Sequence, residues 1–279
     1  MERQKGLTKY HFYVAITALC WSTGGLFIKS VEQSGFLIVG AEAFFALVFC
    51  LLFQRHRFQW TKFVLMTGFF QFLMQICFVF ANLLTTVGNT IVLQYTSMIF
   101  VLIYQSLDKR RLPKPYQLLV IVLALTGMVT FFFDQLSWDG LLGNILAIAS
   151  GAFLGAQFYL NTKEQADANS SLYIQYFLCA LTTLFYLVVH PSIQVSVSDG
   201  LYLLAAGIVT NGISGIFFAK GIEGISGFTA NIICMSEAVL APIWAFLFLH
   251  ERLSPAACIG AVLIGSALVY NSIREVKEP

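Results

Sequence analysis

Charge is scarce in this chain. Only 11% of its 279 residues are Asp, Glu, Lys or Arg, and 16 basic against 14 acidic residues leave a net charge of +2. So few charged residues in so long a chain exclude an ordinary soluble domain. The net charge by itself says nothing about nucleic acid, and we expect no nucleic-acid partner for a chain of this composition.

Motifs for enzymatic chemistry are missing as well. There is no HExxH metal motif, no GxSxG nucleophile turn and no glycine-rich nucleotide-binding loop. The six cysteines occur singly, which is typical of small apolar fillers and not of a disulfide framework or a zinc site. We therefore predict a protein that is not an enzyme and that uses no metal and no cofactor.

A cleavable leader is not indicated either. The basic start, MERQKGLTKYHF, runs into apolar sequence without a small-residue site of the A-x-A kind. This pattern predicts a first membrane span that is not removed as a signal peptide.

Hydrophobic residues are what the chain has in abundance, at 58%, with 15% aromatics and a mean hydropathy of +0.79. A membrane-spanning helix needs about 20 apolar residues. Polar and Gly/Pro positions divide the chain into runs of that length, which predict an all-α, polytopic membrane protein of about ten transmembrane helices. The expected spans are 11–30, 36–53, 62–83, 88–107, 116–133, 140–160, 172–190, 200–219, 225–249 and 255–273.

The loop charges predict an orientation. If the N-terminus is cytoplasmic, all of the 16 basic residues except Lys29 and Arg252 fall on the inner side. This asymmetry is the one that the positive-inside rule describes. We expect a multi-pass protein of the inner (cytoplasmic) membrane, in contact with membrane lipid, with both termini in the cytoplasm.

The two halves of the sequence resemble one another. The segment DKRRLPKPYQLLVIVLALTG, from Asp108, matches LHERLSPAACIGAVLIGSAL, from Leu249, and each follows a long aromatic-rich span. This predicts one five-helix repeat over residues 1–136 and a second over 137–279. Because five is odd, the second repeat must be inverted in the membrane, an arrangement that is typical of transporters with a substrate site near the midplane.

The segment MSEAVLAPIWAFLFLHERLSPAACIGAVLIGSALV, from Met235, resembles the ending of the ten-helix, EamA-type branch of the drug/metabolite transporter superfamily. Span number, duplication and loop charges fit that resemblance, which implies a transporter and places Glu237 in the family motif. Ala238 stands where the family usually has Pro, and Glu42 stands where many members carry a basic or neutral residue. The resemblance therefore implies the fold but not the substrate, and it also raises a homodimer as an expectation.

Two acids lie within predicted spans, Glu237 about midway along the ninth and Glu42 in the second. A carboxylate inside a membrane costs roughly 2.5–3.5 kcal/mol, so it needs a structural or functional reason. Both acids are candidates for proton coupling or for counter-charge to a cationic substrate. The alternative is that each only forms hydrogen bonds to a broken helix.

Polar side chains at helical spacing mark the expected walls of a central cavity lined by spans one, three, four, six, eight and nine. In the third span Gln71, Gln75 and Asn82 share one face. The fourth span adds Gln94 and Tyr95. We predict that the substrate-binding residues are Trp21, Gln75, Gln94, Tyr95, Tyr159, Asn211 and Trp244.

The aromatic members of this set could surround an organic cation together with Tyr104, because each desolvated cation–π contact contributes up to about 2 kcal/mol. Packing between helices is the alternative role for these rings. Trp244 follows Glu237 by nearly two turns, on the same side of the helix.

We therefore expect a secondary active transporter that moves a small polar or cationic metabolite, of the amino acid or quaternary amine type, by alternating access, with protons as the expected coupling ion. One alternative is an uncoupled exporter or facilitator whose intramembrane acids are structural. Another, from a different class, is a membrane receptor or assembly subunit that transports nothing.

Overall fold

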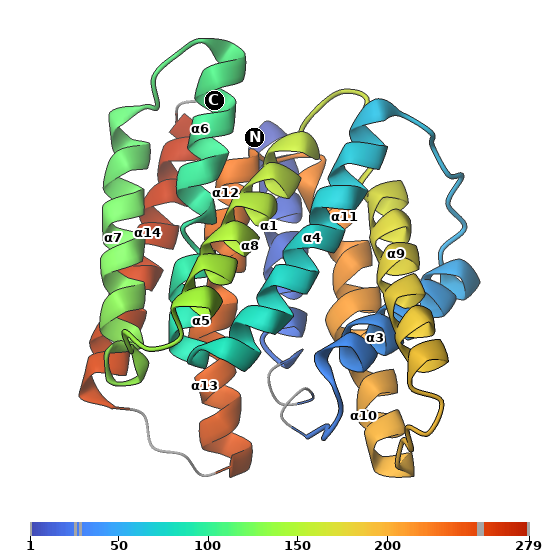
Figure 1. Cartoon of the computed structure of the whole chain (residues 1–279). Helices are drawn as coiled ribbons and strands as arrows, with labels where there is room; N and C mark the ends of the chain where they lie inside the picture. Colours follow the sequence, from blue (N-terminus) through green and yellow to red (C-terminus); the bar gives the residue numbers. More distant parts are fainter. Residues whose placement is uncertain (1, 25–26, 28–29, 250–253, 278–279) are drawn as a thin grey trace.

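The computed structural model describes residues 2–24, 27, 30–249 and 254–277, without the side chains of 2–8, 241–242, 245–249 and 276–277. Lys29 and Arg252 lie outside the described residues. Within them the chain folds into helices joined by loops and turns, and no strand is present (Figure 1).

The helices confirm an all-α membrane protein. Seven of them are long and apolar enough to cross a membrane, and shorter apolar helices cover Pro115–Phe131 and Gly227–Leu240. In chain order the elements are α1 (Glu2–Trp21), α3 (Gly35–Phe53), α4 (Lys62–Leu84), α5 (Val87–Gln94), α6 (Ser97–Lys109), α7 (Pro115–Phe131), the short η1 (Phe133–Gln135), α8 (Leu141–Leu160), α9 (Ala168–Val189), α10 (Val197–Ala206), η2 (Gly207–Ile213), α11 (Ser214–Ile222), α12 (Gly227–Cys234), α13 (Ser236–Leu249) and α14 (Pro255–Lys277).

The first span differs most from its expected bounds of 11–30. Helix α1 begins at Glu2 and ends at Trp21, where Ser22 and Thr23 form a turn. Ser22 Oγ donates to the Leu19 carbonyl and Thr23 Oγ1 to the Cys20 carbonyl, each at 2.7 Å. Such side-chain bonds to the preceding turn compete with continuation of a helix.

Helix starts follow from short polar residues in the loops. Ser34, Thr61, Thr86 and Ser226 each accept a hydrogen bond from the backbone N–H three residues on, at the starts of α3, α4, α5 and α12. These N-caps satisfy donors that the first turn of a helix leaves free. Together they fix where apolar helices begin in a chain with few charges.

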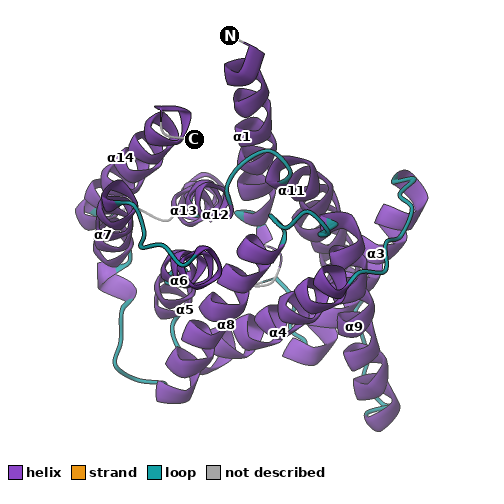
Figure 2. Cartoon of the chain, turned by 90° about the horizontal axis from the view of Figure 1, so that it is seen from above, coloured by secondary structure: helices purple, strands orange, loops and turns teal. Residues whose placement is uncertain are grey.

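The helices pack in pairs. Helix α7 lies against α14 at one edge of the bundle and α3 lies against α9 at the other, with α1, α4, α8 and α11 between them (Figure 2). Glycines allow the close approaches, because a Cβ on Gly127 of α7 would meet Ile264 of α14 at 2.9 Å. Helix α4 packs along α8, and α1 packs along α11.

Two spans are interrupted at their centres. One breaks at Tyr95 and Thr96, between α5 and α6, and the other breaks at Met235, between α12 and α13. Helix α13 continues across Pro242, and the interruption of this span lies seven residues earlier, at Met235. A third span changes to π-helix at η2 before continuing as α11.

We call the end of the bundle at which α1 begins and α14 ends the termini face. The connections α3–α4, α6–α7, α8–α9 and α11–α12 lie at this end (Figure 1). The loops from α7 to α8 and from α9 to α10 lie at the opposite end.

Candidate functional site

The two broken spans meet through Tyr95 and Glu237. The Tyr95 hydroxyl is placed 2.5 Å from Glu237 Oε1 and 3.0 Å from the Cys234 carbonyl, and it donates to this pair of acceptors. The Ala238 N–H donates to the Met235 carbonyl, one residue later than in a continuous α-helix. The break therefore frees the Cys234 carbonyl to accept from the other broken helix.

A second pair joins the same two spans. Ser97, the first residue of α6, and Asn231 of α12 are both fully buried. Asn231 Nδ2 lies 2.8 Å and Asn231 Oδ1 lies 3.1 Å from Ser97 Oγ, each within hydrogen-bond distance. Neither Ser97 nor Asn231 was among the substrate-binding residues predicted from the sequence. The feature of the sequence that could have identified Asn231 is its position at the start of the apolar run that contains Glu237.

Gln94 connects the first break to the α4–α8 pair. Its Nε2 donates to Ser150 Oγ of α8 at 3.0 Å and lies 3.7 Å from the Met74 sulfur of α4. Ser150 Oγ in turn donates to the Met74 carbonyl at 3.2 Å. Gln94, which precedes Tyr95, thus contacts both α4 and α8.

Glu42 occupies a different interface, between α3 and η2. Only 3% of Glu42 is exposed, and its Oε2 accepts a 3.3 Å hydrogen bond from Asn211 Nδ2. A Cβ on Gly207 would lie 2.7 Å from the Glu42 carbonyl, so glycine allows η2 to approach α3 here. Bulges of π-type are frequent at functional sites.

Polar contacts continue from Asn211 to Trp21. The Asn211 carbonyl accepts from the Tyr176 hydroxyl at 2.7 Å and from Ser214 Oγ at 3.2 Å. Trp21 Nε1 donates to Ser214 Oγ at 3.1 Å, while the Trp21 ring stacks on Phe218. These contacts connect the predicted residues Trp21, Asn211 and Glu42 in one continuous series of polar contacts.

The remaining predicted residues are spread over other interfaces. Trp244 Nε1 donates to Ser22 Oγ at 2.8 Å, which joins α13 to the turn after α1. Tyr159 lies beside Tyr104 and under the Lys163 ammonium, near the end of α8. Gln75 is half-buried on α4. In the described part of the chain, the predicted aromatic residues form these separate contacts and not a single box.

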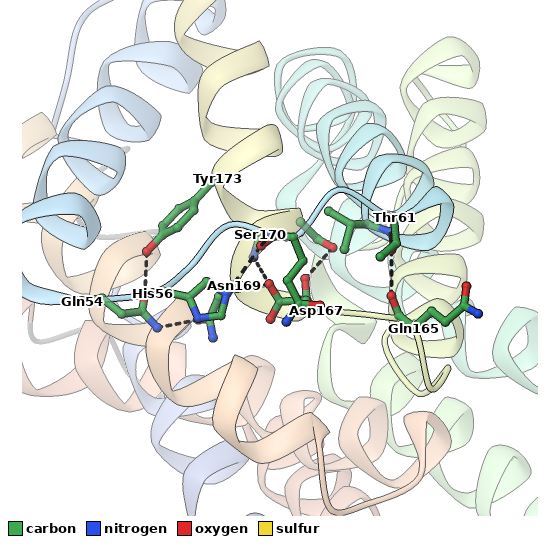
Figure 3. Close-up of polar contacts among 11 residues, drawn as sticks. Gln54, His56, Thr61, Gln165, Asp167, Asn169, Ser170 and Tyr173 are labelled. Carbon is green, nitrogen blue, oxygen red and sulfur yellow. Dashed lines mark hydrogen bonds and ion pairs between the residues drawn. The ribbon is translucent and has the colours of Figure 1, made fainter.

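A polar cluster on the termini face ties the α3–α4 connection to the start of α9 (Figure 3). His56 Nε2 lies 2.7 Å from Asp167 Oδ2, and Thr61 Oγ1 donates to the Gln165 carbonyl at 2.7 Å. Asp167 also caps α9 by accepting from the Ser170 N–H at 3.0 Å. The cluster contains Gln54, His56, Thr61, Gln165, Asp167, Asn169, Ser170 and Tyr173.

An ion pair joins the connection between α8 and α9 to the end of α6. Lys163 Nζ lies 2.6 Å from Asp108 Oδ2 at the end of α6. Partial burial works against the charged form of Lys163, but the hydrogen bond and charge of Asp108 prevail and raise the pKa of Lys163. Residues 161–167 are thus held from α6 and from the α3–α4 connection.

Two surface hollows of about 410 and 470 Å³ lie along α14. The first is lined by residues of α1, α13 and α14, which are apolar except for Ser236, and no acid is among the described residues that line it. Within the described residues, no group of three His, Cys, Asp or Glu side chains is placed to hold a metal ion.

Comparison with known proteins agrees with this architecture. No curated protein matches the chain. One solved structure, titled only "Crystal structure of protein", is similar over 96% of this chain and 98% of its own, with a TM-score of 0.81 at 16% sequence identity, which shows the fold alone. The sequence profile of the EamA-like transporter family matches twice, over residues 8–133 and 141–273. Because the family profile matches both halves, the chain belongs to the EamA-like transporter family and is a membrane transporter of the drug/metabolite type.

Proposed function

We propose that this transporter is a secondary active carrier that moves a small polar or cationic metabolite by alternating access, and that Glu237 couples transport to protons. The observation that carries the proposal is the contact between the two broken helices, in which Tyr95 donates to Glu237 and to the Cys234 carbonyl. Discontinuous helices that meet near the midplane supply the freed carbonyls and side chains of substrate sites in transporters.

The positions of the breaks support an inverted relation between residues 1–136 and 137–279. One break follows Gln94 and the other follows Cys234, and each lies in the fourth span of its half. The pairs α4–α8 and α1–α11 would exchange under such a relation, because they join the third span of one half to the first span of the other. Rocking of one repeat against the other would then alternate access to a central site.

The proposed proton coupling rests on the two acids within spans, of which Glu42 is buried and Glu237 is half-buried. Glu237 and Glu42 both lie within spans, and their hydrogen bonds within the described part of the chain come from Tyr95 and Asn211, neither of which is basic. Their different surroundings favour different roles: Glu237 lies at the meeting point of the broken helices, whereas Glu42 lies at the α3–η2 interface. Movement of one charge across 100 mV is worth about 2.3 kcal/mol, which is enough to bias a transport cycle.

The contacts on the termini face support a closed arrangement at that end. The His56–Asp167 and Lys163–Asp108 pairs both fix residues 161–167. In the proposed cycle these two pairs separate when the central site opens toward the termini face.

An uncoupled facilitator is the second candidate. It is favoured by the fact that each of the two acids has a neutral hydrogen-bond donor, Tyr95 for Glu237 and Asn211 for Glu42, as a structural acid would. In that case either carboxyl would serve to hold two helices together and would keep one protonation state throughout transport.

Flux measurements separate the two candidates. The purified protein is reconstituted in proteoliposomes, and uptake of labelled amino acids and quaternary amines is followed with and without an imposed pH gradient. We expect gradient-driven accumulation by the wild type and gradient-independent exchange by Glu237→Gln. Glu42→Gln serves as the matched comparison, because it removes the other acid that lies within a span.

Flux that ignores the pH gradient in the wild type would reject proton coupling and leave the facilitator. Unchanged coupling in both glutamine variants would reject the assigned role of the acids. Binding of a compound without any flux would instead reject transport.

A further inference from the structure

The interface between α4 and α8 contains buried polar side chains without hydrogen-bond partners. Both Gln71 amide atoms, the Thr67 hydroxyl and Gln157 Oε1 have none among the described residues. Exposure is 0% for Gln71, 0% for Thr67 and 2% for Gln157. Most buried polar side-chain atoms in proteins have a partner, and leaving one unpaired costs about 1–3 kcal/mol, so each of these groups requires a reason.

The register of the two helices places these groups together. Ser150 Oγ of α8 donates to the Met74 carbonyl of α4, and the Phe70 and Phe153 rings stack at 5.8 Å one turn away. The helices therefore run antiparallel here, and the next turn brings Thr67 opposite Gln157. Gln71 lies on α4 one turn from Thr67, on the same face.

The same line of groups reaches from the broken helices to the termini face. At one end Gln94, next to Tyr95, bonds Ser150 and contacts Met74. Gln157 lies seven residues further along α8, about 11 Å at the usual helical rise. One more turn leads to Asn161 at the end of α8, where both side-chain amide atoms are buried and unpartnered.

We infer that Thr67, Gln71, Gln157 and Asn161 form a hydrogen-bonding track in the α4–α8 interface, along which a neutral donor–acceptor group of the substrate passes between the broken helices and the termini face. The assignment of a substrate group rests on the proposed function. It names a chemical class within that proposal: a compound bearing a carboxamide or a similar group, in preference to a quaternary amine.

The chemistry of the track decides this class. Gln71 offers both an N–H donor and a carbonyl acceptor, and Gln157 adds an acceptor. Helix α8 carries no charged residue, and the only one in α4 is Lys62 at its start. A carboxamide satisfies donors and acceptors at once, whereas a quaternary ammonium group can neither donate nor accept a hydrogen bond.

Water accessibility tests the track without requiring transport. Gln71→Cys and Gln157→Cys are made singly in full-length protein, reconstituted, and treated with a charged, water-soluble methanethiosulfonate reagent. Labelling of the engineered site is read by mass spectrometry of its peptide, with the native cysteines left in place. Phe69→Cys and Leu65→Cys, on the exposed outer face of α4, are the matched controls.

We expect both track positions to react about tenfold faster than the controls, because a charged thiol reagent needs water and the bilayer core excludes it. Equal or slower labelling at the track positions in correctly folded protein would overturn the inference. That result would leave the proposed function standing if the wild type still carries flux.

The substrate class is tested by asking which compounds protect the Gln157→Cys variant from labelling by the thiol reagent. This variant retains Gln71. L-Glutamine, L-glutamate and choline are added separately before the thiol reagent. We expect glutamine, which bears the carboxamide, to slow labelling by about tenfold more than the other two, the ratio expected for roughly 1.4 kcal/mol of discrimination. Equal protection by choline, or no protection by glutamine, would overturn the assignment of a carboxamide-type group.

Discussion

Tyr95 and Glu237 are joined by a hydrogen bond between two helices that are each broken in the middle of the membrane-spanning bundle. The same hydroxyl reaches the Cys234 carbonyl, so one phenol satisfies a side chain and a backbone group of the second break. This relationship connects the two halves of the chain at the position where the proposed function places the substrate.

Replacement of Tyr95 by Phe removes that donor and leaves Glu237 and the Cys234 carbonyl unpaired. We expect a loss of roughly 1–3 kcal/mol in the free energy of unfolding, because Cys234 is buried and Glu237 is half-buried, together with a reduced transport rate. Thermal unfolding in detergent and flux in proteoliposomes measure the two effects. Tyr104→Phe is the control, since its hydroxyl makes one 3.3 Å bond to the Ala152 carbonyl from a half-buried position. Equal effects of the two variants would contradict the special position of Tyr95.

Ser97 and Asn231 should show energetic coupling. Residues in direct hydrogen-bond contact typically couple by about 0.5–3 kcal/mol, and this pair is fully buried. A double-mutant cycle with Ser97→Ala and Asn231→Ala, followed by thermal unfolding, measures the coupling. Additive effects of the two substitutions would show that the contact does not stabilise the meeting of α6 with α12.

Gly40 and Gly265 make a matched pair for packing. A Cβ at Gly40 of α3 would collide with the Thr183 hydroxyl and the Cys179 carbonyl of α9, whereas nothing lies within 4 Å of a Cβ at Gly265 of α14. We expect Gly40→Ala to destabilise the protein by about 1–3 kcal/mol. Gly265→Ala should be neutral or stabilise by up to about 1 kcal/mol, because alanine favours a helix over glycine. A shift in unfolding temperature of the same sign and size for both would refute this packing.

Asp167 has two roles on the termini face that different substitutions separate. Asp167→Ala removes both the N-cap of α9 and the contact with His56, and we expect a cost of about 0.5–2 kcal/mol from the lost cap. Asp167→Asn keeps an oxygen for the cap but loses the charge, so we expect a smaller cost in thermal unfolding.

The His56→Ala background supplies the control for this comparison. There, Asp167→Ala should still cost the cap, while Asp167→Asn should cost little or nothing. If each substitution cost as much stability without His56 as with it, the His56–Asp167 contact would contribute nothing to the free energy of unfolding.

Hydrophobic run lengths predict this fold well, because the membrane fixes how many apolar residues a helix needs. The bounds of α3 and α4 differ from the expected 36–53 and 62–83 by at most one residue. The helix breaks could not be predicted in the same way. Neither Tyr95 nor Met235 is a helix breaker, and the interruptions depend on tertiary contacts such as the one between Tyr95 and Cys234.

For the candidate site, too, some features could be predicted from the sequence and others could not. The acids Glu42 and Glu237 could be identified from composition, since a charge in an apolar run is conspicuous. Their partners, Asn211 and Tyr95, were identified as polar residues but not as partners, because pairing across the bundle is not encoded in local spacing. Gln71 shared a predicted stripe with Gln75, and only burial distinguishes the two.

The π-helical segment η2 has a mechanical consequence. A π-turn accommodates more residues than an α-turn, so conversion of residues 207–213 to α-helix would rotate the following helix, α11, by about 100° for each residue displaced. Ser214, at the first position of α11, would turn away from the Trp21 indole. Such a conversion would transmit a local change of winding beside Glu42 as rotation to the helix that contacts α1.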